Sequence, residues 1–139
     1  MTTIEGVKTG RRLGRSALAV LAGLAANVVL AMAADQLMYA MGVFPKPPTV
    51  TYETVPYVLA TAYRAAFGVI GAWLTARLAP QGPMRHALIL GGIGLMLCVA
   101  GAVASFTMDL GPVWYPLVLL AGTLPCAWLG GRPAERGRA

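Results

Sequence analysis

Apolar residues gather in four long runs along this chain, and polar or helix-breaking segments separate the runs. The runs cover residues 16–41, 55–78, 86–107 and 112–130. An α-helix rises about 1.5 Å per residue, so about 20 apolar residues are enough to cross the roughly 30 Å hydrocarbon core of a bilayer. Each run has about this length, and the pattern therefore predicts four transmembrane helices.

The segments between the runs have the composition of turns. Gly42–Thr54 contains three prolines within four residues, which remove backbone donors and favour extended conformations. Residues 79–85 and 108–112 are short and also contain glycine and proline. Short connections place consecutive helices antiparallel. We therefore expect a single transmembrane domain over residues 1–139, folded as an all-α, up-down bundle of four helices.

The composition is that of an integral membrane protein. Hydrophobic residues make up 58% of the 139 residues, charged residues make up 12%, and the mean hydropathy is +0.68. Soluble domains contain about 25% charged residues. Cys98 and Cys126 lie at different depths in predicted spans and have no CxxC spacing, so we expect two free thiols that pack as small apolar side chains.

Positive charge is distributed unevenly between the two ends of the predicted spans. Nine of the eleven Lys and Arg residues lie at one end, namely Lys8, Arg11, Arg12, Arg15, Arg77, Arg85, Arg132, Arg136 and Arg138. Lys46 alone lies at the other end, and Arg64 lies within a span. Lys and Arg accumulate on the cytoplasmic side, so we expect both termini in the cytoplasm and the bundle in the inner membrane of a bacterium. The net charge of +6 does not indicate nucleic-acid binding, because the cations flank spans rather than cover a soluble face.

The first run has a second interpretation. Its basic start, its apolar stretch and the small residues around Ala33 resemble a secretory signal that is cleaved near that residue. The apolar pattern continues through Leu37 to Met41, however, and exceeds the roughly 7 to 15 apolar residues of a signal. We expect a membrane span, with cleavage of residues 1–33 as the alternative, and basic cytoplasmic tails over residues 1–15 and 131–139.

Arg64 is the most unusual residue of the chain, because it lies near the middle of the second predicted span. A guanidinium group at that depth costs about 2.5 to 3.5 kcal/mol on insertion scales and therefore needs a partner or water. Asp35 in the first span differs from it by only about 5 Å in depth, which an arginine side chain can bridge. The two residues either fasten two helices together, form a proton-titrating or anion-binding site beside a cavity, or face other partners.

Other polar residues extend this candidate site. Glu53, Tyr57 and Arg64 follow one face of the second helix, and Thr61 lies beside that face. Asn27 points into the same broad interior sector from the first span, where it either joins the site or makes a hydrogen bond between helices. We therefore expect a polar site built from Asp35, Arg64, Asn27, Tyr57, Glu53 and Thr61.

Small residues indicate where the helices pack closely. Gly91, Gly94 and Gly101 recur on one stripe of the third span together with Cys98 and Ser105. Gly68 and Gly71 form a similar site on the second span. Small residues allow two helix backbones to approach each other in a bilayer, so we expect these five glycines to lie at helix contacts.

No sequence motif identifies a reaction. The chain has no HExxH, GxSxG, phosphate-binding GxxxxGK[ST] or CxxC motif, and His86 is its only histidine, so we expect no enzyme activity, no metal site and no cofactor. The prediction is a non-catalytic accessory or interaction subunit whose partners are the lipid bilayer and either a homo-oligomer or a membrane complex. The alternative is an oligomeric small-solute transporter or channel that uses Asp35 and Arg64. Solvent access to these two residues distinguishes the two functions.

Overall fold

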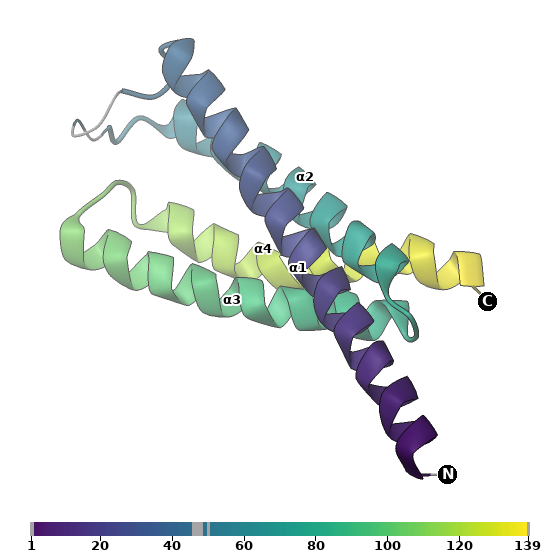
Figure 1. Cartoon of the computed structure of the whole chain (residues 1–139). Helices are drawn as coiled ribbons and strands as arrows, with labels where there is room; N and C mark the ends of the chain where they lie inside the picture. Colours follow the sequence, from purple (N-terminus) through teal and green to yellow (C-terminus); the bar gives the residue numbers. More distant parts are fainter. Residues whose placement is uncertain (1, 46–48, 50, 139) are drawn as a thin grey trace.

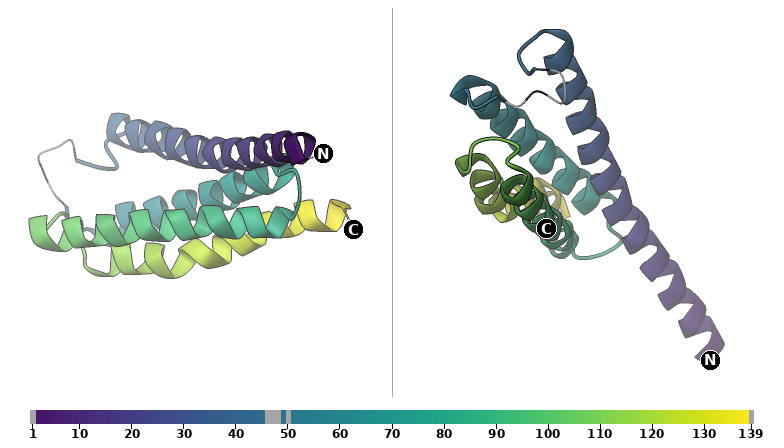
Figure 2. Two further views of the ribbon diagram at one scale, coloured as in Figure 1. Left: turned by 60° about the horizontal axis from the view of Figure 1, so that its bottom comes forward. Right: turned by 90° about the vertical axis from the view of Figure 1, so that its left-hand side faces the viewer.

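The computed structural model describes residues 2–45, 49 and 51–138, and every regular element in these ranges is an α-helix. The helices are α1 (Thr2–Ala40), α2 (Thr54–Leu78), α3 (Pro83–Met108) and α4 (Trp114–Arg138). They form the expected up-down bundle, in which α1 crosses the other three helices obliquely (Figure 1). We call the end that holds both termini and the α2–α3 turn the terminal end, and the opposite end the loop end (Figure 2).

Three of these helices are long and apolar enough to cross a membrane. The apolar stretches cover Lys8–Ala40 in α1, Thr54–Leu78 in α2 and Pro83–Met108 in α3. α4 is as long as α2, but its last part is polar and it contains Pro125 and Pro133, and within the described residues it is not among the helices that are apolar enough to span. The predicted membrane protein is thus supported by three helices rather than four.

The described parts of both segments that we expected to be tails are helical and continue α1 and α4. α1 begins at Thr2 and α4 continues to Arg138, well beyond the predicted boundaries at residues 16 and 130. Residues 2–15 contain no proline, and the glycines in this stretch have open space around them, so nothing interrupts the helix. Pro133 removes only one backbone hydrogen bond and does not end α4.

The tight turns follow from local residue chemistry. Gly82 has a left-handed backbone (φ 59°), and Pro83 occupies the first position of α3, where its missing donor costs nothing. At the other end of α3, Asp109 caps the helix in the left-handed region (φ 50°), which Asp tolerates better than most residues. These two turns reverse the chain on either side of α3. Lys46, the cation predicted on the opposite side, lies outside the described residues.

Small residues bring the helices together at the terminal end. The buried cluster there consists of Val20, Ala72, Ala76, Ala87, Leu90 and Ala127. Beside it, α1 meets α2 where Gly23 lies against Gly71 and Thr75, and the Thr75 hydroxyl donates a 3.0 Å hydrogen bond to the Ala19 carbonyl. α1 contacts α2 and α3 but not α4. The helices therefore pack closely around this cluster, and α1 is held mainly by α2.

The predicted packing glycines lie in different surroundings. A Cβ atom at Gly71 would stand 2.8 Å from the Gly23 carbonyl oxygen, and one at Gly91 would stand 2.6 Å from the Ala127 Cβ. Gly94 faces Thr123 at 3.3 Å, whereas Gly68 has only an ordinary contact with α4 at 3.6 Å. Nothing lies within 4 Å of a Cβ at Gly101, so this glycine makes no close helix contact. The reason is that α3 and α4 separate around a cavity beside Gly101.

Candidate functional site

Asp35 and Arg64 lie side by side between α1 and α2. The Arg64 Nη2 donates to the Asp35 Oδ2 over 2.6 Å, which makes this a charge-assisted pair. The Tyr63 hydroxyl donates to the other carboxylate oxygen, Oδ1. Two consecutive residues of α2 therefore hold one carboxylate of α1. The pair is not sealed, because 36% of the Arg64 side chain and 26% of the Asp35 side chain are exposed.

Asp35 does not satisfy all donors of the guanidinium group. The Arg64 Nε is buried and has no hydrogen-bond partner among the described residues. A buried donor without an acceptor costs free energy that a new acceptor would recover. Arg64 also lines three separate cavities, of about 400, 390 and 370 Å³. These three cavities therefore share Arg64 as a lining residue.

The largest of these three cavities opens at the loop end, and we call it the loop-end cavity. Asp35, Arg64 and five aromatic residues line it, namely Tyr39, Phe44, Tyr57, Tyr63 and Tyr115. Neighbouring rings contact one another: the Phe44 and Tyr57 centroids are 5.9 Å apart, and those of Tyr57 and Tyr115 are 4.9 Å apart. The result is a salt bridge at the base of an aromatic-walled cavity.

Tyr57, in the first turn of α2, contacts the connection between α3 and α4. Its hydroxyl donates a 3.3 Å hydrogen bond to the Leu110 carbonyl, and its ring packs against Gly111, where a Cβ atom would collide with the phenol. Tyr52 makes a parallel but longer contact of 3.5 Å to the Asp109 carbonyl. The nearby side-chain carboxylate of Asp109 raises the pKa of the Tyr52 phenol through a hydrogen bond. Tyr57 also lines the loop-end cavity, together with Tyr39.

The other two cavities contain the remaining polar residues of the site. One lies between α2, α3 and α4, where Cys98, Gly101 and Ser105 face Arg64. The other is a largely apolar groove between α1 and α4, in which Asn27 and Thr61 also line the wall. The Thr61 hydroxyl donates to the Tyr57 carbonyl of its own helix at 2.8 Å. Asn27 packs over Gly71 and has no hydrogen bond within the described part of the chain.

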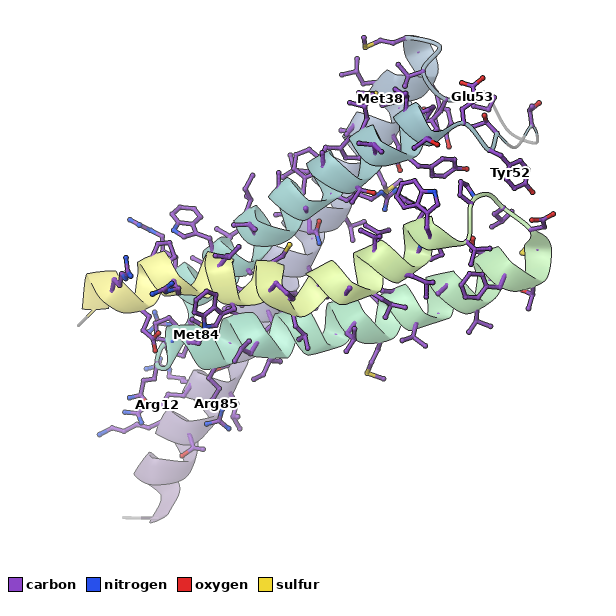
Figure 3. All side chains as sticks on the ribbon, turned by 180° about the vertical axis from the view of Figure 1, so that it is seen from behind. Arg12, Met38, Tyr52, Glu53, Met84 and Arg85 are labelled. Atoms are coloured by element: carbon purple, nitrogen blue, oxygen red, sulfur yellow. The ribbon has the colours of Figure 1, made fainter. Side chains whose placement is uncertain are left out.

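Glu53 does not join the other predicted site residues. It precedes the first residue of α2, is exposed, and lies at the loop end of the molecule (Figure 3). Helical spacing predicted that Glu53 shares a face with Tyr57 and Arg64. This spacing does not apply to Glu53, because residue 53 has an extended backbone (φ −66°, ψ 137°). The structure brings together Asp35, Arg64 and Tyr57 at one cavity, and Arg64, Asn27 and Thr61 at another.

Two residues of the site, Tyr63 and Tyr115, were not predicted from the sequence. Tyr63 follows Thr61 and precedes Arg64, and its position in the middle of an apolar run was the available signal. Tyr115, near the start of α4, lines two of the three Arg64 cavities. A tyrosine beside an intramembrane charge is a candidate hydrogen-bond partner, whereas the position of Tyr115 follows only from the packing of α4 on α2.

The arrangement offers one carboxylate, several hydrogen-bond donors and aromatic walls. Within residues 2–45, 49 and 51–138, no three His, Cys, Asp or Glu side chains gather as metal ligands, and Cys98 and Cys126 are free. The site can hold a small solute with an acceptor oxygen against Arg64 while the rings cover its apolar part. Comparison of the chain with protein-family models, curated proteins and solved structures finds no match to any of them.

Proposed function

We propose that this chain is a multi-pass protein of the bacterial inner membrane, with four spans, both termini in the cytoplasm, and a binding site for a small organic anion. Three apolar helices and the large apolar side chains exposed on their surfaces support the membrane assignment. The cation bias toward the terminal end supports the orientation. Trp73 and Trp128, stacked with Arg77 and Arg132, suit an inner interface at the same end.

One observation carries the binding proposal: Arg64 lines an open cavity and keeps a buried Nε–H without an acceptor. A carboxylate matches this deficit, because a guanidinium group presents several donors in one plane and binds carboxylates through two of them. The cavity of about 400 Å³ suits a solute of modest size. Its aromatic walls would pack against an apolar or ring-shaped part of the solute.

Tyr63 explains how Asp35 tolerates such a ligand. An incoming carboxylate competes with Asp35 for Arg64, and the displaced Asp35 would otherwise be an unpaired charge at membrane depth. The Tyr63 hydroxyl already donates to the second oxygen of Asp35 and can remain there. Binding therefore exchanges one carboxylate for another at Arg64. In an oligomeric transporter, this exchange would be the loading step.

A binding experiment with benzoate as the probe tests the proposal. Trp73→Phe and Trp128→Phe leave Trp114, whose ring centroid is 6.2 Å from that of Tyr115, as a fluorescent reporter at the cavity. Benzoate should change the Trp114 emission with saturation and raise the unfolding temperature in detergent. Arg64→Gln should abolish both effects, and Arg64→Lys should weaken them, since lysine keeps the charge but loses the planar donor set.

The matched control is Arg77→Gln, an arginine of the same helix that lies near the terminal end. It should leave the benzoate response unchanged. No saturable response in the parent protein to benzoate or to acetate would refute the proposal, as would an equal response in the Arg64→Gln variant.

The second candidate function is an accessory subunit, and the apolar groove between α1 and α4 favours it. Side chains from all four helices line this groove of about 370 Å³, and the backbones of α1 and α4 do not approach each other across it. A helix of a partner protein could fill such a groove. If Asp35→Leu with Arg64→Leu keeps every cellular phenotype of the parent and benzoate does not bind, the accessory function is correct and the anion site is not.

A further inference from the structure

A cavity of about 460 Å³ lies at the terminal end, far from the Asp35–Arg64 pair, and we call it the terminal-end pocket. Arg12 and Ser16 of α1 form one wall, and Arg85, His86 and Ile89 of α3 form the other. The α2–α3 turn closes the third side. Figure 3 shows Arg12 and Arg85 next to each other at this end. Two helices that are distant in sequence therefore contribute one cation each to a single pocket.

Neither arginine has an acidic partner. No ion pair involves Arg12 or Arg85 among the described residues, and both side chains are exposed. The amino end of α3 adds partial positive charge to the same place. Two uncompensated guanidinium groups at one pocket are a site for an anion with several oxygen atoms, of which phosphate is the typical case.

His86 adds a polar contact of a different kind. Only 8% of its surface is exposed, and its Nδ1 donates to the Gly82 carbonyl over 3.0 Å. A neutral imidazole that donates through Nδ1 accepts through Nε2, and Nε2 has no partner within the described part of the chain. The pocket thus offers an acceptor for a hydroxyl group beside its two phosphate donors.

Apolar residues continue the pocket toward the middle of the bundle. Ile89 lies one helical turn beyond Arg85 on α3, and Leu13 follows Arg12 on α1; both line the pocket and are exposed. A free phosphate ion would make no favourable contact with this apolar wall. We propose that the terminal-end pocket binds an anionic phospholipid, with the phosphate held by Arg12 and Arg85 and the start of an acyl chain against Ile89 and Leu13. Basic pockets between membrane helices on the cytoplasmic side are suited to such headgroups.

The hydroxyl acceptor at His86 points to a headgroup that carries a hydroxyl, such as the glycerol of phosphatidylglycerol. This inference rests on the membrane location but not on the anion site at Arg64, because the two cavities share no residue. A failure of benzoate binding therefore leaves it untouched.

Native mass spectrometry of the purified chain tests the proposal, with phosphatidylglycerol and phosphatidylcholine as probes. The parent should retain one phosphatidylglycerol in preference to phosphatidylcholine. Arg12→Gln with Arg85→Gln should weaken this binding at least about tenfold more than the control, because it removes charge-assisted hydrogen bonds as well as charge. The control is Arg11→Gln with Arg136→Gln, which removes two exposed cations that do not line the pocket. Equal losses in the two double variants would overturn the proposal.

Two further measurements separate the remaining outcomes. Glycerol 3-phosphate should fail to displace the lipid at equal concentration, and displacement would mean that a free phosphate ester is the ligand. Phosphatidylglycerol with a photoreactive acyl chain should label the unaltered protein near Leu13 and Ile89. This labelling needs no variant, so it decides the matter even if Arg12→Gln with Arg85→Gln fails to fold, and labelling confined to other segments would overturn the proposal.

Discussion

Asp35 accepts hydrogen bonds from two consecutive residues of α2, and this arrangement decides how the site responds to substitution. Tyr63 and Arg64 point about 100° apart on their helix, so one carboxylate reaches both only because it lies between them. The carboxylate is therefore fixed in orientation by two donors of different charge. Arg64, in contrast, has one acceptor and a donor to spare.

Breaking the pair from either side should destabilise the protein. Asp35→Asn or Arg64→Gln leaves the other charge without its partner, and we expect each to lower the free energy of unfolding by about 3 kcal/mol. Asp35→Leu with Arg64→Leu removes both charges and should cost much less. Unfolding in mixed detergent measures all three. A double variant that is as unstable as the sum of the two single variants would contradict this account.

The Tyr63 hydrogen bond can be tested separately. Tyr63→Phe removes one donor to an ionised acceptor and should lower the free energy of unfolding by about 1.5 kcal/mol. Tyr39→Phe is the matched control, because Tyr39 lines the same cavity but its hydroxyl has no hydrogen bond among the described residues. If the two variants are equally stable, Tyr63 does not hold Asp35.

At the scale of elements, the position of α1 depends on a few small residues. The backbone of α1 does not come close to that of α4, and α1 packs tightly on α2 at Gly23. A shorter chain that began after residue 33 would retain Asp35 but lose this contact. The alternative of a cleaved signal therefore implies a much less firmly held first helix.

Gly23→Ala tests this contact directly. A Cβ atom at Gly23 would collide with the Thr75 hydroxyl and the Gly71 carbonyl, so we expect a loss of about 1 to 3 kcal/mol in the free energy of unfolding. Gly101→Ala is the control from α3, where the added atom meets open space. It should be neutral or stabilising by up to about 1 kcal/mol, because alanine favours helix more than glycine does. The reverse order of stability would refute this packing.

At the scale of the whole molecule, the cluster of cations and the loop-end cavity lie at different ends. The terminal end holds the cations and the buried core of small residues, whereas the loop end holds the aromatic cavity. If the terminal end faces the cytoplasm, the loop-end cavity opens on the opposite side. Solutes would then reach Arg64 from outside the cell.

Thiol labelling in intact cells tests this orientation. In a background with Cys98→Ala and Cys126→Ala, an impermeant reagent should modify Thr49→Cys at the loop end and leave Gln81→Cys in the α2–α3 turn unlabelled. Both positions are exposed, so access to the side chain is not limiting. After the cells are opened, both variants should react. Labelling of Gln81→Cys alone in intact cells would reverse the proposed topology.

The sequence by itself determined the helical fold, the positions of the turns and the presence of a charged residue that needs a partner. These features depend on local information: apolar run length, proline and glycine in the connections, and the cost of one guanidinium group among apolar residues. The helices extend beyond the predicted span boundaries, because residues 2–15, for example, contain no proline that would interrupt α1.

Only the tertiary structure decided what surrounds Arg64. Gly91 and Gly101 have the same pattern in the sequence, yet one packs against α4 and the other lies beside a cavity, because α3 and α4 touch at one end and separate at the other. Tyr115 reaches Arg64 for the same reason. The distance between two helices at a given depth depends on the angle at which they cross and on contacts between residues far apart in the chain. A local sequence pattern does not determine this distance, so the cavities could not be predicted from the sequence.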